Sequence, residues 1–355
     1  MNVMEGSRDL EANQCPQVAV SVIVLNYNGR AYLFGCLKSV LASNFSDFEL
    51  VLVDNASSDG SLDESISRIS DSRLRVVRSL RNLGYAGGNN LGAAHSGGKY
   101  LVFLNFDTIV DSRWLDEVVL FMEERFDVGI AQCSLHLIEN PRTFDNIGHY
   151  IDSIGLTYFL GRHEIDRGQY NSTREMFGAF GAALVVRAQL FRQLRGFDAD
   201  FFMFFEESDL CWRAWIAGYK VAFIPKAMVL HKGAVTYDSK QEYDSAKNAY
   251  HFTRNRLTAL LKNYELVNVL RLAPANILFM LGLSVIDLRK RKTREALAIF
   301  RGLYWNLRNF DRTARKRQEV ERLRRNSDGF LMNKNIIRRF DMQRAVVKAQ
   351  DMRVI

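Results

Sequence analysis

The chain has 355 residues, 48% hydrophobic and 12% aromatic, which suffices for one large globular domain or for a domain with an appendage. Its net charge is +8 at pH 7, and its four cysteines show neither CxxC nor paired spacing. This composition argues against a disulfide framework and a zinc site.

Cys15, Cys36, Cys133 and Cys211 are therefore expected to be free thiols in a reducing compartment. The segment Met1–Gln17 is polar and mixed in charge, so we expect neither a signal peptide nor an anchor there.

Charge is distributed unevenly along the chain. Residues 286–355 hold 20 Lys/Arg and 8 Asp/Glu, a net charge of +12, whereas residues 1–285 hold 28 and 32, a net charge of −4. A basic tail beside an apolar segment suits an anionic membrane face better than nucleic acid. A solvated helical face is the alternative explanation.

Strand-like and helix-like segments alternate through the first hundred residues. The predicted strands are Val18–Asn26, Glu49–Val53, Leu74–Val77 and Tyr100–Leu104, and the predicted helices are Ala31–Ala42, Ser61–Ile69 and a short one opening in 81–90. Runs of β-branched residues indicate strands buried on both faces. This alternation predicts an α/β fold with a mostly parallel sheet and covering helices.

Polar side chains stand at the end of each predicted strand or in the loop that follows it: Asn26, Asp54, Asn82 and Asp107. Ligands of such sheets bind beyond the carboxyl ends of the strands, so we expect a ligand site at this edge. The stretch Gly84–Asn90 does not have the dinucleotide-binding spacing, but its glycines allow close backbone approach to a ligand.

The middle of the chain is less regular. Further strands are predicted at Val128–Cys133, Phe177–Arg187 and Lys220–Pro225, and a loop over the site at Thr143–Gln169. Small residues from Gly178 to Ala183 leave room for a bulky group to pack against the backbone.

Residues 201–213 combine an aromatic run with three acids, Glu206, Glu207 and Asp209. The aromatic run is expected to be buried, and the acids are expected to open a helix that runs through Ala217. Carboxylates are favoured in a first helical turn in any protein. An apolar approach would also raise a carboxylate pKa toward the range of a general base.

Seven stretches occur in one order between about residues 20 and 235: SVIVLNYNG, LVLVDNASSDGS, NLGYAGGNNLG, YLVFLNFDT, GAALVVR, GFDADFFMFFEESDLCWRAWIAGYKV and VLHKG. Through them the chain resembles the family 2 nucleotide-sugar glycosyltransferases of GT-A fold, in particular the rhamnosyltransferase-like members. The resemblance implies an inverting, metal-dependent transfer of a sugar from a nucleoside diphosphate donor to an acceptor hydroxyl.

The resemblance also implies residue roles. The nucleotide sugar would be bound by Asn26, Asp54, Asn82 and Asn105, and Mg²⁺ or Mn²⁺ would be held by Asp107 and His231. The catalytic base would be Glu207, with Glu206 as the alternative. Asp209 would orient the acceptor or the helix, or would pair with Arg213. The family's metal-binding DxD motif is Asn105-Phe106-Asp107 here, so its first acid is missing.

The predicted domains are a GT-A domain at 18–263, ending in a helix at 241–263, and a basic helical extension at 264–355. Leu272–Ile286 contains 15 largely apolar residues, fewer than a spanning helix needs, and basic residues flank it. An interfacial or re-entrant helix is expected, and a helix packed on the body is the alternative. Residues 311–355 should form one or two surface helices.

The expected partners are a nucleoside diphosphate sugar, with dTDP-rhamnose as the first candidate, a glycan or lipid-linked acceptor, and the inner face of the cell membrane, with the protein cytoplasmic and peripheral. Two other classes compete with this interpretation. A sugar nucleotidyltransferase should carry a Gly-rich basic loop after its first strand, where this chain has Asn26-Tyr-Asn-Gly29. An inactive glycan- or nucleotide-binding relative would explain the reduced DxD motif. Nucleic acid is not expected as a partner, because only the charge of the tail favours it.

Overall fold

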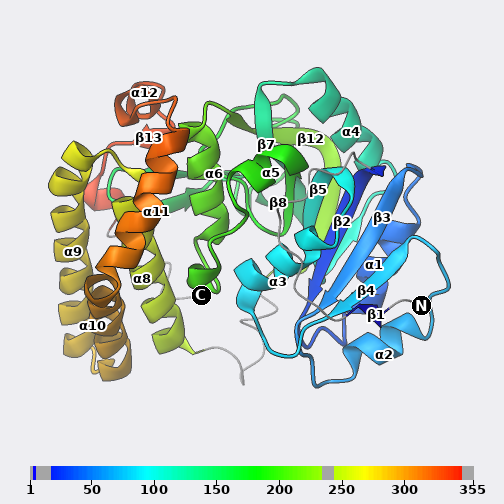
Figure 1. Ribbon diagram of the computed structural model, residues 1–355, viewed down its shortest axis with the longest axis horizontal. Helices are drawn as coiled ribbons and strands as arrows, with labels where there is room; N and C mark the ends of the chain where they lie inside the picture. Colours follow the sequence, from blue (N-terminus) through cyan, green and yellow to red (C-terminus); the bar gives the residue numbers. More distant parts are fainter. Residues whose placement is uncertain (1–2, 5–16, 234–243, 346–355) are drawn as a thin grey trace. The chain divides into compact units, whose positions relative to one another are not determined.

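The computed structural model describes residues 3–4, 17–233 and 244–345 (Figure 1). Two compact units divide them. The first contains the described residues up to His149, with Phe159–Ala214 and Tyr219–Gly233, and the second contains Tyr150–Tyr158, Trp215–Gly218 and the described residues from 244 onward. Cys15 and the first three residues of the helix predicted at 241–263 lie outside the described residues.

A large mixed sheet forms the centre of the first unit. In the described chain its order is β1-β4-β3-β2-β5-β11-β7-β12-β6, and β8 pairs with β7. Its strands are β1 (Val3–Met4), β2 (Val18–Asn26), β3 (Phe48–Asp54), β4 (Leu74–Arg78), β5 (Gly98–Asn105), β6 (Thr108–Val110), β7 (Val128–Leu137), β8 (Asn140–Asn146), β11 (Ala183–Arg187) and β12 (Lys220–His231). The first five strands in this order are parallel, and β11 is antiparallel to both of its neighbours.

Helices cover both faces of this sheet. They are α1 (Leu33–Leu41), α2 (Ser61–Ile66), α3 (Gly84–Ala94), α4 (Trp114–Glu124), α5 (Ala188–Gln193) and α6 (Glu206–Ile216), with a 3-10 turn η1 (Ala199–Phe201) before α6. The fold is therefore the predicted α/β sheet with flanking helices.

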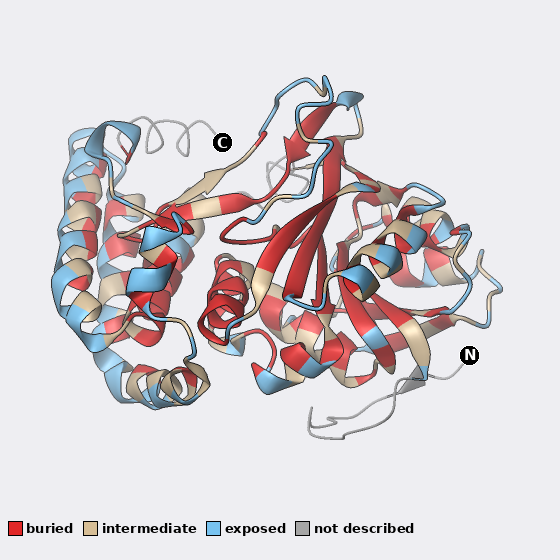
Figure 2. Ribbon diagram, turned by 90° about the horizontal axis from the view of Figure 1, so that it is seen from above, coloured by how far each residue is buried: buried red, intermediate tan, exposed pale blue. Residues whose placement is uncertain are grey.

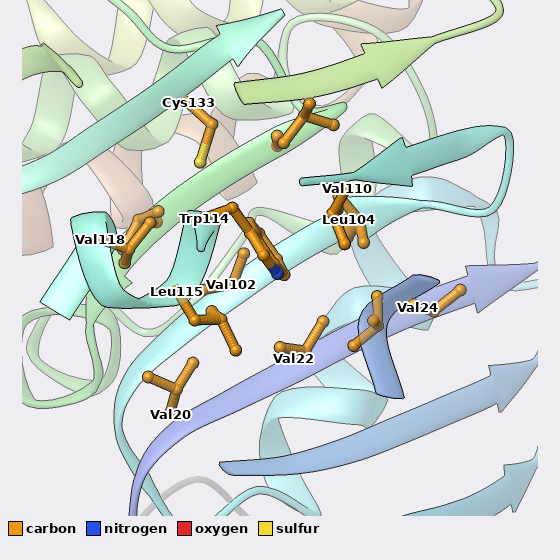
Figure 3. Packing of buried hydrophobic residues seen from close by; sticks show 14 of the residues in the cluster. Val20, Val22, Val24, Val102, Leu104, Val110, Trp114, Leu115, Val118 and Cys133 are labelled. Atoms are coloured by element: carbon orange, nitrogen blue, oxygen red, sulfur yellow. The ribbon is translucent and has the colours of Figure 1, made fainter. Parts of the chain in front are cut away.

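Alternate residues of β2 explain the two layers. Val20, Val22 and Val24 point toward the side of α4, where they lie in one buried cluster with Trp114 and Leu115 (Figure 3). The intervening residues face α3, since a Cβ added at Gly88 would meet Leu25 and one added at Gly92 would meet Ile23. Full burial of each such aliphatic side chain stabilises the fold by about 1.5–3 kcal/mol.

Two predictions for the middle of the chain are wrong. The loop predicted at Thr143–Gln169 contains the end of β8 and the strands β9 (His149–Asp152) and β10 (Thr157–Phe159). Register shifts between β7 and β8 break the alternation of side chains by which such strands are recognised. The strand predicted at Phe177–Arg187 is regular only from Ala183, after its glycines.

β12 continues beyond the predicted end at Pro225 to His231. A register shift between Ile224 and Met228 lets the strand pass the proline, which cannot donate a ladder hydrogen bond. This continuation carries His231 to the strand end.

The second unit is mainly helical. Its helices are α8 (Ser245–Asn263), α9 (Leu266–Arg289), α10 (Thr293–Arg308), α11 (Phe310–Leu323) and α12 (Asp328–Asn333), and β13 (Ile337–Arg338) pairs in parallel with β9. The helix α8 packs against α9, α10 and α11. Buried residues of these helices and of the sheet are coloured red in Figure 2. The predicted domain boundary after residue 263 stays a prediction.

The apolar segment at 272–286 is part of a longer helix than expected. α9 has 24 residues and includes Pro274. It extends the predicted segment by residues 266–271 and 287–289, which contain apolar as well as polar residues. Judged by length and composition alone, α9 is the one helix among the described residues that is long enough and apolar enough to cross a membrane. Beyond it, the tail forms α11 and α12 as surface helices, and the strand β13 was not predicted.

Candidate active site

The carboxyl ends of β2 and β3 bring Asn26 and Asp54 together. The two residues lie directly opposite each other in the parallel ladder, and Asn26 Nδ2 donates to Asp54 Oδ1 over 3.0 Å. The same amide donates to Ser57 Oγ at 3.0 Å and Ser61 Oγ at 2.8 Å, while its oxygen accepts from the Gly29 N–H. Asn26 is fully buried. Asn26 and Asp54, which are predicted to bind the sugar donor, are thus held in place by contacts within the protein.

Asn82 belongs to a neighbouring turn. Its Oδ1 accepts from Asn55 Nδ2 at 3.0 Å and from the N–H of Gly84, the first residue of α3, at 2.8 Å. Asn82 itself is exposed, and Asn55, which adjoins Asp54, is buried. Asn55 therefore links the loop after β3 to the start of α3, a role that sequence reasoning missed.

The glycine at the start of α3 serves a contact within the protein. Gly84 has φ +71°, and a Cβ there would lie 2.2 Å from the carbonyl oxygen of Phe202. The same turn of α3 is tied to this carbonyl, since Ala86 N–H donates to it at 3.2 Å. At Gly84 the close approach that was predicted for a ligand is made instead by the backbone that leads into α6.

Asp107 and His231 lie side by side at the turn after β5 and at the end of β12. His231 Nε2 is 3.4 Å from Asp107 Oδ2, and His231 Nδ1 is 2.9 Å from Asp145 Oδ2. Burial by itself would lower the pKa of His231, but the two carboxylates outweigh it and raise that pKa to about 10. Asn105 is half-buried, two residues before Asp107, and its N–H donates to Ala182 O.

These residues fit a divalent cation in part. The separation of 3.4 Å between Asp107 Oδ2 and His231 Nε2 would let both atoms contact one divalent cation, provided that the imidazole gives up the proton that the two carboxylates stabilise. Asp145 holds the other nitrogen of the imidazole, as outer carboxylates do for metal-binding histidines. No group of three or more His, Cys, Asp or Glu side chains with metal-binding geometry occurs among the described residues, so a donor diphosphate or water would have to complete the coordination.

The acids predicted as catalytic open α6, which begins at Glu206 as expected. Three residues just before it, Phe202, Phe204 and Phe205, have positive φ between 62° and 74°. Such backbone costs about 1–3 kcal/mol per residue and is found mainly where function demands it. The aromatic run is not buried throughout as predicted, since its three central residues, 202–204, are half-buried.

Glu206 and Glu207 are short of hydrogen-bond partners. Glu206 is buried and Glu207 half-buried, and within the described part of the chain the buried Oε2 of each has no partner. Burial raises the pKa of Glu207 to about 7. Burial, followed by the neighbouring charge of Glu207, raises the pKa of Glu206 well above its usual range. At neutral pH this pair can therefore hold one proton and accept another.

Asp209 has a different environment. It is fully buried and forms an ion pair with Arg213, whose Nε and Nη2 both lie 2.8 Å from Asp209 Oδ2. Arg213 also donates to the carbonyls of Leu194 and Gly196. This is the i+4 pairing given as an alternative from the sequence, and it connects α6 to the turn before η1.

A short segment lies between Tyr85 and the Asp107–His231 pair. Gly181 O accepts from Tyr85 Oη at 2.7 Å, and the ring of Phe180 lies 6.1 Å from that of His231. Burial, then the charges of Glu207 and Glu206, raise the pKa of Tyr85 well above its usual value. A Cβ at Gly181 would meet Tyr85 Oη at 2.6 Å, which confirms that the small residues here admit a bulky neighbour.

Tyr85 and Asp145 were both missed as site residues. Tyr85 lay within a glycine-rich stretch that was considered only for its glycines. Asp145 lay within the segment predicted to be a loop, 86 residues before the histidine that it contacts. A contact between residues so far apart leaves no pattern in the sequence.

Comparison with known proteins shows which sequences and which fold the chain resembles. Residues 21–195 match the sequence model of the family described as Glycosyl transferase family 2. An uncharacterized glycosyltransferase of Haemophilus influenzae is 30% identical over 126 residues, which make up 35% of this chain and 38% of that protein. The O-antigen biosynthesis protein RfbC of Myxococcus xanthus is 28% identical over 224 residues, 60% of this chain and 17% of that protein. The chain thus spans less than half the length of these relatives.

Among solved structures, the mannosyltransferase PcManGT from Pyrobaculum calidifontis, in complex with GDP-Man and Mn²⁺, is similar with a TM-score of 0.51. The similarity covers 85% of this chain and 89% of that chain at 16% identity. At this identity the likeness shows the fold, which is the GT-A fold expected from the sequence. This fold and the match over residues 21–195 identify a glycosyl transferase family 2 domain in the chain.

Proposed function

We propose that the protein is an inverting glycosyltransferase that moves a sugar from a nucleoside diphosphate donor to a hydroxyl of a glycan or lipid-linked acceptor. The observation that carries this proposal is the pair Glu206 and Glu207, each with one buried oxygen that has no partner in the described chain. The charges of this pair act on Tyr85, which donates to Gly181 O, and the neighbouring Phe180 ring lies near that of His231. A carboxylate with a pKa of about 7 suits a general base at neutral pH.

In the proposed reaction the acceptor oxygen attacks the anomeric carbon and its proton passes to Glu207. The bond from the anomeric carbon to the phosphate oxygen breaks with its electron pair, and the nucleoside diphosphate leaves. One base on the side of attack gives a single displacement with inversion. Asn26, Asp54, Asn82 and Asn105 would bind the donor.

A divalent cation, Mg²⁺ or Mn²⁺, is part of this proposal. Asp107 and His231 would hold it, with Asp145 orienting the imidazole. When bound, such an ion neutralises charge that develops on a departing diphosphate. The complex of PcManGT with GDP-Man and Mn²⁺ supports the pairing of a nucleotide sugar with a metal in a related fold.

Polysaccharide and cell-envelope biosynthesis is the proposed setting, at the cytoplasmic face of the cell membrane. The Myxococcus xanthus relative, an O-antigen biosynthesis protein, supports the first part. The rhamnosyltransferase-like pattern of motifs makes dTDP-rhamnose the first donor to test. Residues 18–263 would form the catalytic domain.

A catalytically weak or inactive nucleotide-binding relative is the second candidate, because Asn105 replaces the first acid of the metal-binding motif. A thermal-shift panel with UDP, dTDP and GDP, each with and without Mn²⁺, separates the candidates in two steps. A nucleotide at 100 times its Kd should stabilise the fold by about 2.7 kcal/mol. Donor hydrolysis and transfer are then measured by nucleotide release, and inversion by the anomeric configuration of the product. A metal-dependent shift without transfer to any acceptor would favour the second candidate, and no shift would count against both.

A further inference from the structure

The helix α9 has the reverse of the usual polarity of a helix in a globular protein. Its buried positions form one stripe that includes three polar residues: Ala273, Asn276, Met280, Ser284 and Asp287. Its exposed large hydrophobic side chains are all aliphatic: Leu266, Val267, Leu270, Leu278, Val285, Ile286 and Leu288. From Pro274 to Leu288 no exposed residue of α9 is charged.

The polar stripe is anchored inside the second unit. Asn276 Nδ2 donates to Ile154 O at 2.8 Å, and Ser284 Oγ donates to Ala296 O of α10 at 3.3 Å. Near the middle of the helix, Met280 Sδ accepts from Arg256 Nη2 of α8. These contacts fix which side of α9 faces the unit and therefore which side faces outward.

The helix α10 adds an exposed apolar stripe of its own. Leu297, Phe300, Tyr304 and Leu307 recur at helical spacing on its exposed side, and each is at least 47% exposed. Arg294, Arg301 and Arg308, spaced by seven residues, form an adjacent exposed row. Because α9 and α10 pack against each other, two apolar surfaces and a row of arginines belong to one helical pair.

Every exposed charged side chain between Leu266 and Arg308 in this pair is basic. They are Arg271, Arg289, Lys290, Arg291, Lys292, Arg294, Arg301 and Arg308. Arg294 forms an exposed ion pair with Asp244. The acids of the pair, Asp287 and Glu295, are buried or half-buried.

We propose that the outward side chains of α9 and α10, here called the α9–α10 face, dock on a bilayer surface that contains anionic lipids. The aliphatic side chains would enter the boundary between headgroups and acyl chains, and the basic residues would contact lipid phosphates or carboxylates. This inference rests on the proposed function in one respect only: the membrane would present the lipid-linked acceptor.

Two other occupants fit less well. If α9 spanned the bilayer, two arginines would enter the hydrocarbon with it: Arg256, which contacts the middle of α9, and Arg301 of the packed helix α10. Guanidinium groups are strongly disfavoured there. A second copy of the chain would bring two all-basic faces together. Charge complementarity therefore favours an anionic surface with α9 lying along it.

Vesicle flotation of the full chain tests this proposal. The protein is mixed with vesicles of phosphatidylcholine alone or with phosphatidylglycerol, at low and high salt. We expect binding to the anionic vesicles, weakened by salt. The double variant Leu278→Gln/Phe300→Gln should bind about tenfold more weakly for each side chain. Replacing Arg289, Lys290, Arg291 and Lys292 by Gln should weaken binding about fivefold per charge.

The matched control is Leu80→Gln/Phe126→Gln, which changes two exposed apolar residues of the first unit and should bind as the parent does. Circular dichroism and the thermal midpoint check that all variants fold. A parent that stays with the unbound fraction for both vesicle types would overturn the proposal. So would a Leu278→Gln/Phe300→Gln variant that binds as the parent does, or a parent dimer that this variant converts to monomer.

The base variant Glu207→Gln separates this proposal from the proposed function. It should float with anionic vesicles as the parent does while transferring no sugar. If the parent protein bound anionic vesicles but no nucleotide stabilised it, the proposed function would be refuted and the membrane-docking proposal would stand. Nucleotide-dependent stabilisation without vesicle binding would do the reverse.

Discussion

The two sides of the candidate site differ in how fully their polar groups are hydrogen-bonded. At the donor edge, the amide nitrogen of Asn26 shares its two hydrogens among three oxygens, and its own oxygen accepts one hydrogen bond, all with neighbouring protein groups. At the start of α6, Glu206 and Glu207 each keep a buried oxygen without a partner in the described chain. The first arrangement stabilises the fold, and the second destabilises it.

This difference indicates where binding and where chemistry should take place. A satisfied network holds donor-binding groups in position at no cost when the ligand arrives. Unsatisfied, desolvated carboxylates have raised pKa values and accept protons readily. Natural proteins keep such strained groups mainly where activity needs them.

The largest effect is expected at the acid side. Glu207→Gln should lower turnover by about 10²–10⁴-fold, because amide nitrogen and oxygen cannot take the acceptor proton. Nucleotide binding, followed by thermal shift, should stay near that of the parent. Glu206→Gln is the matched variant and should keep more activity. The opposite ranking of the two variants would move the base to Glu206.

Asp209 was grouped with the catalytic acids from the sequence, but its contacts predict a structural effect. Asp209→Ala should destabilise the fold by about 3–5 kcal/mol, because Arg213 would remain buried without its carboxylate. Urea unfolding measures this. The control Glu64→Ala breaks an exposed pair with Arg30 and should cost less than about 1 kcal/mol. An Asp209→Ala protein of normal stability that no longer transfers sugar would show instead that Asp209 contacts the acceptor.

At the donor edge a smaller loss of stability is expected. Asn26→Ala removes a buried amide that bonds Asp54, Ser57 and Ser61, so the free energy of unfolding should fall by about 1–3 kcal/mol. Donor affinity should fall too, since Asp54 loses the group that orients it. Asn140→Ala, at the exposed start of β8, is the control. Unchanged donor affinity in a folded Asn26→Ala protein would remove Asn26 from the donor site.

Local patterns predicted the donor edge well. The strand Val18–Asn26 and the start of the next helix at Ser61 were predicted correctly. Buried parallel strands are continuous runs of β-branched residues, and such runs end at polar turn residues. Once the strands are parallel and adjacent, Asn26 must lie beside Asp54. This part of the site follows from segment order alone.

The acid side and its surroundings were predicted less completely. The sequence placed Glu206 at the start of a helix, but nothing in it showed that Phe202 would adopt positive φ against Gly84. The Asp145–His231 contact depends on β8, whose irregular register hides its alternation. The length of α9 was underestimated because helix boundaries depend on packing as well as on apolar residues.

The dependence on pH tests the origin of this contrast. Burial raises the pKa of Glu207 to about 7, and Glu206, Asp209 and Tyr85 lie around it. Below pH 7 the fraction of Glu207 that can act as base falls about tenfold per pH unit, and kcat should fall with it.

Because the pKa is higher in the folded state than in the unfolded state, the unfolded protein binds fewer protons between the two values. The free energy of unfolding should therefore be highest below about pH 4.5 as far as Glu207 is concerned, and should decrease as the pH rises to about 7. Glu207→Gln should abolish that decrease and gain at most about 3 kcal/mol above pH 7. Glu206→Gln should leave the kinetic pKa near 7, since burial is its main cause. A kinetic pKa that drops to the ordinary glutamate value in Glu206→Gln would instead show that the charge of the pair, and not its desolvation, sets the proton affinity of the base.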